Sequence, residues 1–383
     1  MVTSQGERRL VGDKRPVVVI ALVISTAVAT LVSTSGGPVR PFNFCLTCNF
    51  RWLADWLANV AMFVPLGLAM NWKRRHFIRT TLRVAAFSIS IELLQTTIPG
   101  RDPTLSDVIA NSIGGAFGAL LGRSGGMWLA PPQRLADRLL ALAIVMVAIT
   151  VAETEWLLAP TTNLPVGSQA LNAVSALVRG SATMAFNTVS TPSSAQQPVL
   201  VVAPARQLPL LYIGRISDDA IFQYRSRGRE LRLDQPAYLV SDFFDSTAKA
   251  DTIRITVGRE GAGWCLSRTN KRSCGIGPTV GLGWAILRYP YSLKHRWHRA
   301  LRDVWAALLF LPVGFWSRRR TLPVAVLAAA LILGPYARFT PLLPTPMDEW
   351  IGAFAGLTAG FAARTLVFRS RMAKGVGSPP GAL

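Results

Sequence analysis

Long apolar segments, each bordered by arginine or lysine, constrain this 383-residue chain more than any other feature of its sequence. A run of roughly 18 or more apolar residues with few charges can cross the hydrocarbon core of a bilayer as a helix. Only 16% of the residues are charged, whereas soluble proteins carry about a quarter. The apolar segments predict about eight spans, at residues 16–34, 53–72, 84–98, 105–122, 139–158, 304–316, 322–336 and 350–368.

The basic residues predict the orientation of these spans, because the cytoplasmic ends of membrane helices are enriched in Arg and Lys. With both termini in the cytoplasm, the inner ends carry basic clusters such as residues 73–75 and 318–320, and the short outer loops carry isolated arginines such as Arg40, Arg51 and Arg101. In a soluble protein the net charge of +21 would indicate nucleic-acid binding. The distribution favours membrane orientation instead, so we expect membrane lipids and no nucleic acid as partners.

The first apolar segment, residues 16–34, is compatible with two interpretations. Basic residues precede it, and Ala-Val-Ala at residues 27–29 has the form of a signal-peptide cleavage site. The apolar run continues through Leu31 and Val32, which favours an uncleaved anchor. Both interpretations place the following residues outside the cytoplasm.

Hydrophobic character falls between residues 159 and 300, where the sequence predicts an extracytoplasmic β-rich domain. Residues 159–197 are partly rich in Ser, Thr, Asn and Pro, which indicates a linker or a partly disordered segment. Arg225, Arg227 and Arg229 alternate and are predicted on one face of a strand, as a solvated face or as a surface for anionic lipid headgroups or acidic cell-wall polymers. Predicted strands occupy residues 198–203, 221–224, 238–240 and 252–257.

The four cysteines form two close pairs, Cys45 with Cys48 and Cys265 with Cys274. No histidine cluster accompanies either pair, so we expect no metal and no cofactor. In an oxidising compartment, two local disulfides are the simplest prediction, the second across a hairpin tip. The Cys-x-x-Cys spacing also suits redox chemistry, but no thioredoxin-like pattern of strands and helices surrounds it.

Polar residues near the outer ends of the second, third and fourth spans are the main functional candidates. An ionisable group within a span costs a few kcal/mol and therefore needs a partner or a water-filled pocket. Glu92 requires such a partner, and Arg101 is the nearest basic residue in the sequence. Two interpretations remain open, a polar network that only holds helices together and a functional pocket. The candidate pocket residues are Asn59, Glu92, Gln95, Arg101, Asp107 and Asn111.

Small residues in the same spans are assigned to packing. A stripe of glycines spaced by four lets a neighbouring helix approach closely. Pro65 should kink its helix and help to shape a cavity. The packing residues are Pro65, Gly67, Gly114, Gly118 and Gly122.

Several motifs in this region together resemble the VanZ-like family. The resemblance covers residues 55–122 and keeps the order of the family's motifs. It implies a bacterial envelope protein, in a family named for a member associated with teicoplanin resistance, and it maps the family's polar residues onto the candidate pocket. The matching residues are Asn59, Phe-Val-Pro-Leu-Gly at 63–67, Ile-Glu-Leu-Leu-Gln at 91–95, Gly-Arg at 100–101, and Asp-Val-Ile-Ala-Asn at 107–111 with Gly114.

Residues 301–368 resemble a degenerate second copy of residues 53–122. Both contain a proline-glycine motif followed by basic residues, and Asp348 opens the last segment as Asp107 does. Aligning these two aspartates leaves the glycine stripes out of phase by a residue or more. The second copy lacks the acid and amide of the third span, so we expect the first copy to carry any chemistry. The second stripe consists of Gly352, Gly356 and Gly360.

The sequence therefore predicts an α-helical polytopic membrane protein with an inserted extracytoplasmic β-rich domain. The resemblance implies the bacterial inner membrane, and the distribution of basic residues predicts that both termini are cytoplasmic. Its divisions are an N-terminal anchor with an outer loop, the VanZ-like region, a connecting span, the β-rich domain, the degenerate copy and a basic tail, at residues 1–52, 53–122, 123–158, 159–300, 301–368 and 369–383.

The expected function is binding of a lipid-linked or amphiphilic cell-envelope ligand, such as a cell-wall precursor, at an outer-leaflet pocket. The resemblance connects this expectation with glycopeptide (teicoplanin) resistance. One alternative is an intramembrane hydrolase or transferase that uses Glu92 and Asp107 as acid and base and Arg101 to hold a lipid-linked phosphate. Another is a transporter, because parallel repeats are common in that class. The sequence shows no nucleophile motif, so binding is favoured over catalysis.

Overall fold

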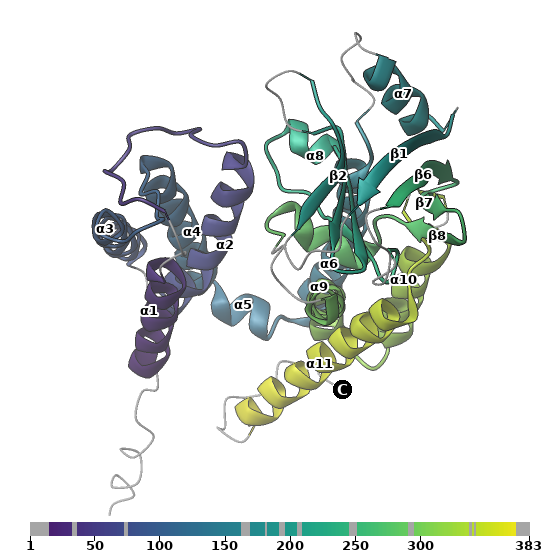
Figure 1. Cartoon of the computed structure of the whole chain (residues 1–383). Helices are drawn as coiled ribbons and strands as arrows, with labels where there is room; N and C mark the ends of the chain where they lie inside the picture. Colours follow the sequence, from purple (N-terminus) through teal and green to yellow (C-terminus); the bar gives the residue numbers. More distant parts are fainter. Residues whose placement is uncertain are drawn as a thin grey trace, which may run out of the picture. The chain divides into compact units, whose positions relative to one another are not determined.

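The computed structural model (Figure 1) forms two compact units, Met1–Pro131 and Pro132–Leu383, which we call the N-terminal and C-terminal units. The basic cluster at residues 73–75 and most of the predicted tail lie outside the described residues. The structure describes residues 15–32, 37–72, 76–161, 169–180, 182–190, 196–204, 209–244, 251–289, 295–336, 339–340 and 342–372.

In the N-terminal unit, the closest helix contact is between α2 and α4. It depends on glycines that have no Cβ: a Cβ at Gly114 would overlap the carbonyl oxygen of Val60, and a Cβ at Gly118 would overlap that of Val64. The backbones of α2 and α4 can come into contact only because these two positions have no side chain. The helices are α1 (Arg15–Leu31), α2 (Trp52–Met70), α3 (Phe77–Gln95), α4 (Leu105–Arg123) and α5 (Gly125–Leu129).

In the C-terminal unit, four long helical segments share one apolar core, to which Val151, Phe310, Ala329 and Leu357 contribute. A second pair of helices approaches to backbone contact, because a Cβ at Gly356 would overlap the carbonyl oxygen of Ala307. The segments are α6 (Gln133–Leu158), α9 (His295–Trp316), α10 (Leu322–Leu331) with its continuation η3 (Ile332–Tyr336), and α11 (Met347–Met372).

Two four-stranded antiparallel sheets form the β-rich domain of this unit, and they share one core that contains Phe222 and Trp264. One sheet has the order β1-β6-β7-β8 and the other β2-β3-β4-β5. The strands are β1 (Met184–Ser190), β2 (Gln197–Val202), β3 (Leu211–Ile216), β4 (Asp219–Tyr224), β5 (Tyr238–Val240), β6 (Asp251–Glu260), β7 (Gly263–Arg268) and β8 (Lys271–Ile276).

Three short helices complete the β-rich domain and connect it to the long helices α6, α9, α10 and α11. They are α7 (Gln169–Val178), α8 (Arg227–Glu230) and the 3-10 helix η2 (Val280–Ile286). At the attachment, the Tyr224 hydroxyl donates a 3.0 Å hydrogen bond to the Leu158 carbonyl at the end of α6. Burial raises the pKa of Tyr224 to about 12, so the phenol stays protonated and keeps this donor.

Each predicted apolar segment coincides with a helix, but only part of the membrane prediction is confirmed. Within the described ranges, four helices are by length and composition long and apolar enough to cross a membrane. The eight-span arrangement and its orientation stay predictions. The helices that meet the criterion cover Trp52–Met70, Leu105–Arg123, Gln133–Leu158 and Met347–Ser370.

The four predicted strands are confirmed as β2, β4, β5 and β6, and two other predictions for this domain are wrong. β4 ends at Tyr224, and the arginines that follow do not extend it, because Arg227 and Arg229 belong to the helical turn α8. Arg229 lies 3.8 Å from the buried carboxylate of Asp234. The prediction of a linker or partly disordered segment is wrong where α7 and β1 form, because α7 buries apolar side chains such as Leu177 on the sheet core. Residues 162–168, 181 and 191–195 of that segment lie outside the described residues.

Both cysteine pairs lie at disulfide distance, as predicted. The Cα atoms of Cys45 and Cys48 are 5.5 Å apart, and those of Cys265 and Cys274 are 4.1 Å apart. The second pair joins the neighbouring strands β7 and β8 close to their hairpin turn.

Candidate functional site

The N-terminal halves of α2 and α4 bring Asn59 and Asp107 together. The Asn59 amide donates a 2.6 Å hydrogen bond to Oδ1 of Asp107. Thr104 is extended and forms the N-cap of α4: its hydroxyl accepts from the Asp107 N–H at 3.2 Å and donates to Oδ2 of Asp107 at 2.9 Å. The carboxylate therefore lies in the first turn of α4, where the helix dipole favours negative charge. Both Asn59 and Asp107 are half-buried.

Glu92 lies deeper and is bound to the same threonine. Its side chain is 2% exposed, and its Oε2 accepts a 3.1 Å hydrogen bond from the Thr104 N–H. The two carboxylates are thus linked by one residue, Glu92 through the backbone of Thr104 and Asp107 through its hydroxyl. Glu92 itself is closed off by packing.

Gln95 and Arg101 are directed to the end of α1. The Gln95 amide donates to the Thr30 carbonyl at 2.9 Å, and the Arg101 guanidinium donates to the Val32 carbonyl at 2.6 and 3.0 Å. The last carbonyls of a helix have no partner within the helix and attract cations. The sequence suggested an ion pair between Arg101 and Glu92. In the structure, the Arg101 guanidinium instead donates to these carbonyls of α1.

Asn111 joins α4 to α3. Its amide donates a 2.9 Å hydrogen bond to the hydroxyl of the buried Ser88. Asn111 is 2% exposed, so this bond is an interhelical contact within the packed unit. The six predicted residues therefore divide into Asn59 and Asp107, which bind each other and are half-buried, and four residues whose hydrogen-bond partners lie elsewhere in the unit.

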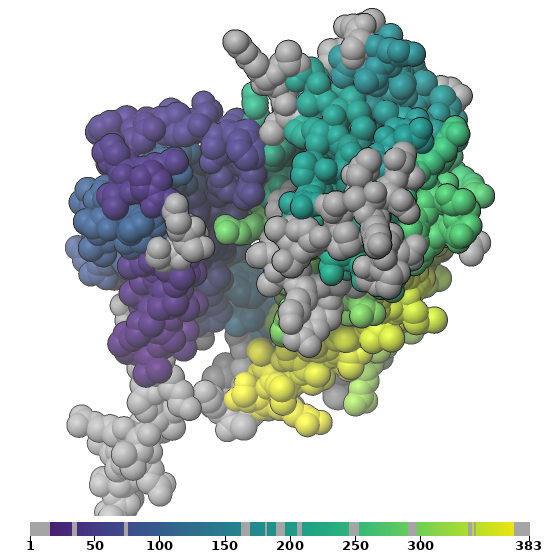
Figure 2. Space-filling model, in the orientation of Figure 1, coloured from purple at the N-terminus to yellow at the C-terminus, as the bar shows by residue number. Residues whose placement is uncertain are grey.

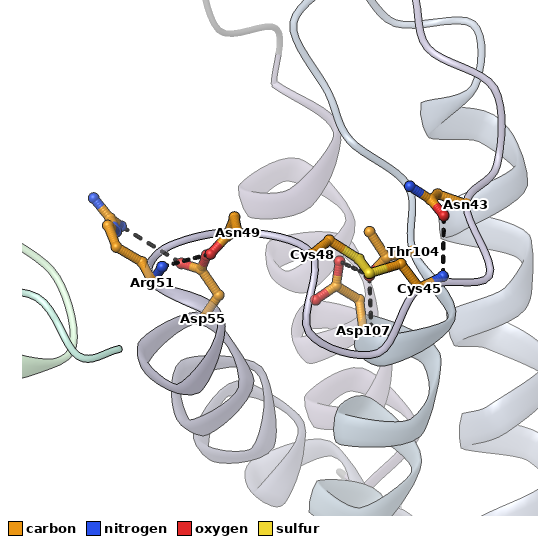
Figure 3. The surroundings of a disulfide bond; sticks show 8 residues. All are labelled: Asn43, Cys45, Cys48, Asn49, Arg51, Asp55, Thr104 and Asp107. Carbon is orange, nitrogen blue, oxygen red and sulfur yellow. Dashed lines mark hydrogen bonds and ion pairs between the residues drawn. A yellow bond between two sulfur atoms is a disulfide. The ribbon is translucent and has the colours of Figure 1, made fainter. Parts of the chain in front are cut away.

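Residues 41–51, which precede α2, pair at Asn43 with the residues that begin α4, and we call this segment the strap. The Asn43 N–H donates to the Pro103 carbonyl at 3.0 Å, and the Leu105 N–H donates to the Asn43 carbonyl at 2.9 Å. Figure 3 shows the Cys45–Cys48 loop of the strap beside Thr104 and Asp107. Apolar side chains of the strap are exposed, with Phe44 at 77%.

The C-terminal unit contains a second buried carboxylate, Glu349, that the sequence analysis missed. Glu349 lies in the first turn of α11 and is 0% exposed. It accepts hydrogen bonds from the Thr279 hydroxyl and, at 2.8 Å, from the Gly281 N–H. Arg302 of α9 lies 3.9 Å from Glu349 and 3.3 Å from Asp348.

The glycine stripes contain the signal that identifies Glu349. Glu349 precedes Gly356 by seven residues, as Asp107 precedes Gly114 by seven (356 − 349 and 114 − 107). Aligning the stripes, rather than the aspartates, places Glu349 opposite Asp107.

Among the described residues, one group contains three side chains of metal-binding type close together, Glu260, Cys265 and Cys274. The two sulfurs of this group form a disulfide and therefore offer no thiolate.

The VanZ/LLP1 family matches residues 16–127, a range that includes α2 to α4, α1 without its first residue, and all six candidate residues. No curated protein matches the chain, and no solved structure matches it.

Proposed function

Because residues 16–127 place this chain in the VanZ-like family, we propose that it is an envelope protein whose Asn59–Asp107 pair binds an amphiphilic ligand. The ligand is lipid-linked or otherwise amphiphilic, as a cell-wall precursor is. In this proposal the chain crosses the bacterial inner membrane several times, with both termini in the cytoplasm and the β-rich domain outside.

The half-buried state of Asp107 is the observation that carries the proposal. Each of its oxygens accepts one hydrogen bond from the protein, from Asn59 and from Thr104. A carboxylate has about four acceptor positions, so both oxygens retain capacity for donors from a ligand. Asn59 and Thr104 hold the group in one orientation, which reduces the entropy that binding must remove.

We propose further that the two membrane-type regions are copies of one unit. In each, an extended segment pairs with the loop before the last helix: the strap with Pro103 and Leu105, and Pro278 with the Leu343 N–H at 2.8 Å. In the C-terminal unit, residues from that segment also donate to the helix-start carboxylate, Glu349.

This parallel indicates the chemistry of the ligand. Glu349 is satisfied by a hydroxyl and a backbone amide of its own chain, from Thr279 and Gly281. Asp107 is in the matching position, and the hydrogen bonds described for it come from Asn59 and Thr104 alone. A ligand that carries hydroxyl and amide donors, as a sugar-peptide does, would supply at Asp107 what residues 279–281 supply at Glu349.

The geometry supports an intramembrane hydrolase less well. Glu92 is closed off by packing, and the Arg101 guanidinium binds carbonyls of α1, so neither is placed to reach a lipid phosphate. The proposed repeat remains compatible with transport, since parallel repeats occur in transporters. A link to glycopeptide resistance stays part of the proposal through the family alone.

We expect the Asp107→Asn substitution to weaken ligand binding about tenfold, because it removes the charge from a hydrogen bond that is worth about 1.5–3 kcal/mol. The probe is a lipid-linked disaccharide-pentapeptide, titrated by calorimetry into the full chain in neutral detergent. Asp102→Asn is the matched control, since Asp102 is exposed and pairs with Arg40 in the same unit. Equal affinities for the two variants would contradict the proposal.

A further inference from the structure

The C-terminal unit contains a cavity of about 580 Å³ where α9 meets the β-rich domain. Residues of β5, β8 and η2 contribute to its wall, together with residues 343–346 before α11 and the first turns of α9. The strands β6–β8 and α11 can be followed on the surface in Figure 2, in green and yellow.

One wall of the cavity is basic. His298, Arg299 and Arg302 of α9 line it, and no carboxylate is among the lining residues. Arg302 is compensated, because it lies 3.3 Å from Asp348 and 3.9 Å from Glu349. Arg299 is exposed and makes neither a hydrogen bond nor an ion pair within the part of the chain that the structure describes, although the Asp303 carboxylate is near enough to interact electrostatically. Arg299 is therefore the guanidinium of this wall that is open to an anionic group.

The remaining walls are apolar or aromatic, with Leu282, Leu343 and Ile276 among the lining residues. Tyr289 is held in place, because its ring stacks on His298 at 4.7 Å and its hydroxyl donates to the Ala237 carbonyl. Cations beside apolar surface suit a ligand with an anionic group and an apolar part.

The cavity lies at the polar end of a membrane-type helix. After Arg302 and Asp303, α9 becomes apolar, and its side chains Val304 and Leu308 are exposed by 52% and 58%. Exposed apolar side chains on such a helix face lipid, and arginines at its end lie at the depth of lipid headgroups. An amphiphile in the bilayer would therefore present its headgroup at this depth.

We propose that this cavity binds the phosphate-bearing headgroup of an amphiphile, with the phosphate at Arg299. Guanidinium groups bind phosphate oxygens by charge-assisted, bidentate hydrogen bonds. The Leu282 and Leu343 side of the cavity holds the glycerol or the first carbons of the chain. The site is independent of Asp107, which lies in the other unit.

Calorimetric titration of the full chain, in neutral detergent, with dihexanoyl phosphatidate tests the site. We expect Arg299→Gln to weaken binding about tenfold, which corresponds to about 1.4 kcal/mol, through loss of one charge-assisted pair. Arg254→Gln is the matched control, since Arg254 is exposed on β6 outside the cavity and its loss changes the net charge equally. Arg299 is exposed, so the variant should fold, and its unfolding temperature is measured alongside.

Two further titrations complete the test. Inorganic phosphate as the ligand distinguishes a lipid phosphate from free phosphate, and the Asp107→Asn variant distinguishes this site from the one proposed at Asp107. Inorganic phosphate is expected to bind at least tenfold more weakly than phosphatidate, because it lacks the apolar part; equal affinity would overturn the assignment to an amphiphile. Asp107→Asn is expected to bind phosphatidate as the unchanged protein does. No binding of phosphatidate, or an equal loss in Arg254→Gln and Arg299→Gln, would overturn the site itself.

Discussion

A single methyl group at Gly118 is expected to force α2 and α4 apart and to lower the free energy of unfolding by about 1–3 kcal/mol. The Cβ of Gly118→Ala would overlap the carbonyl oxygen of Val64 and approach the Leu68 nitrogen at 2.8 Å. Both are backbone atoms, so no rotamer change can relieve the contact. The loss outweighs the gain in helix propensity of about 1 kcal/mol that alanine brings over glycine.

Gly126→Ala is the control for this experiment. It adds the same methyl group in the same unit, but a Cβ at Gly126 would meet nothing within 4 Å. The thermal unfolding of both variants is followed by circular dichroism in detergent. If Gly118→Ala unfolds at the same temperature as Gly126→Ala, the close approach of α2 and α4 is wrong.

The helices of this fold could be predicted because their signal is local. Apolar runs and glycine stripes can be recognised within short stretches of the sequence. The segments found from them coincide with α1 to α4, α6 and α9 to α11. The four strands that were found are short β-branched or aromatic segments between turns, which is also a local pattern.

The wrong or missing predictions depend on contacts between distant residues. The Arg101 guanidinium binds carbonyls at the end of α1. Every residue has a backbone carbonyl, so the sequence does not indicate which one will act as an acceptor. α7 lies in a segment rich in small polar residues, and its apolar face matters only because a sheet core lies beneath it. Alternating arginines after β4 suggested a longer strand, yet the buried Asp234 binds Arg229 in a helical turn.

The candidate site shows the same division. Composition and spacing selected the polar residues, but only the packing separates the half-buried Asn59–Asp107 pair from the closed-off Glu92, Gln95 and Asn111. Asp348 and Glu349 are neighbours, and aligning the aspartates rather than the glycine stripes selected Asp348 as the counterpart of Asp107. The structure selects Glu349, because its carboxylate receives the donors of residues 279–281.

Removal of that carboxylate should have the largest effect on the C-terminal unit. We expect Glu349→Ala to lower the free energy of unfolding by about 3–5 kcal/mol, the range for breaking a buried charged pair. The Thr279 hydroxyl and the Gly281 N–H would lose their acceptor in a site without solvent, at a cost of about 1–3 kcal/mol per buried group. Glu349→Gln keeps one acceptor oxygen and should lose less.

Glu260→Ala serves as the control, because the Glu260 side chain is 56% exposed and its ion pair with Arg272 lies at the surface, where such pairs contribute about 0–1 kcal/mol. Hydrogen exchange at the Gly281 amide gives a local measurement: its protection should fall in Glu349→Ala and remain in Glu260→Ala. Equal unfolding temperatures and unchanged protection would show that Glu349 does not hold residues 279–281 in place.

The proposed repeat predicts which of the two matching carboxylates, Asp107 or Glu349, contributes more to the free energy of unfolding. Asp107→Ala should lower the free energy of unfolding less than Glu349→Ala, because Asp107 is half-buried and water can replace the lost acceptor for Asn59 and Thr104. A carboxylate that contributes little to stability but is held in one orientation is what a binding site requires. A stability loss at Asp107 as large as that at Glu349 would instead assign both groups to helix packing, and the Asn59–Asp107 pair would then not be a ligand site.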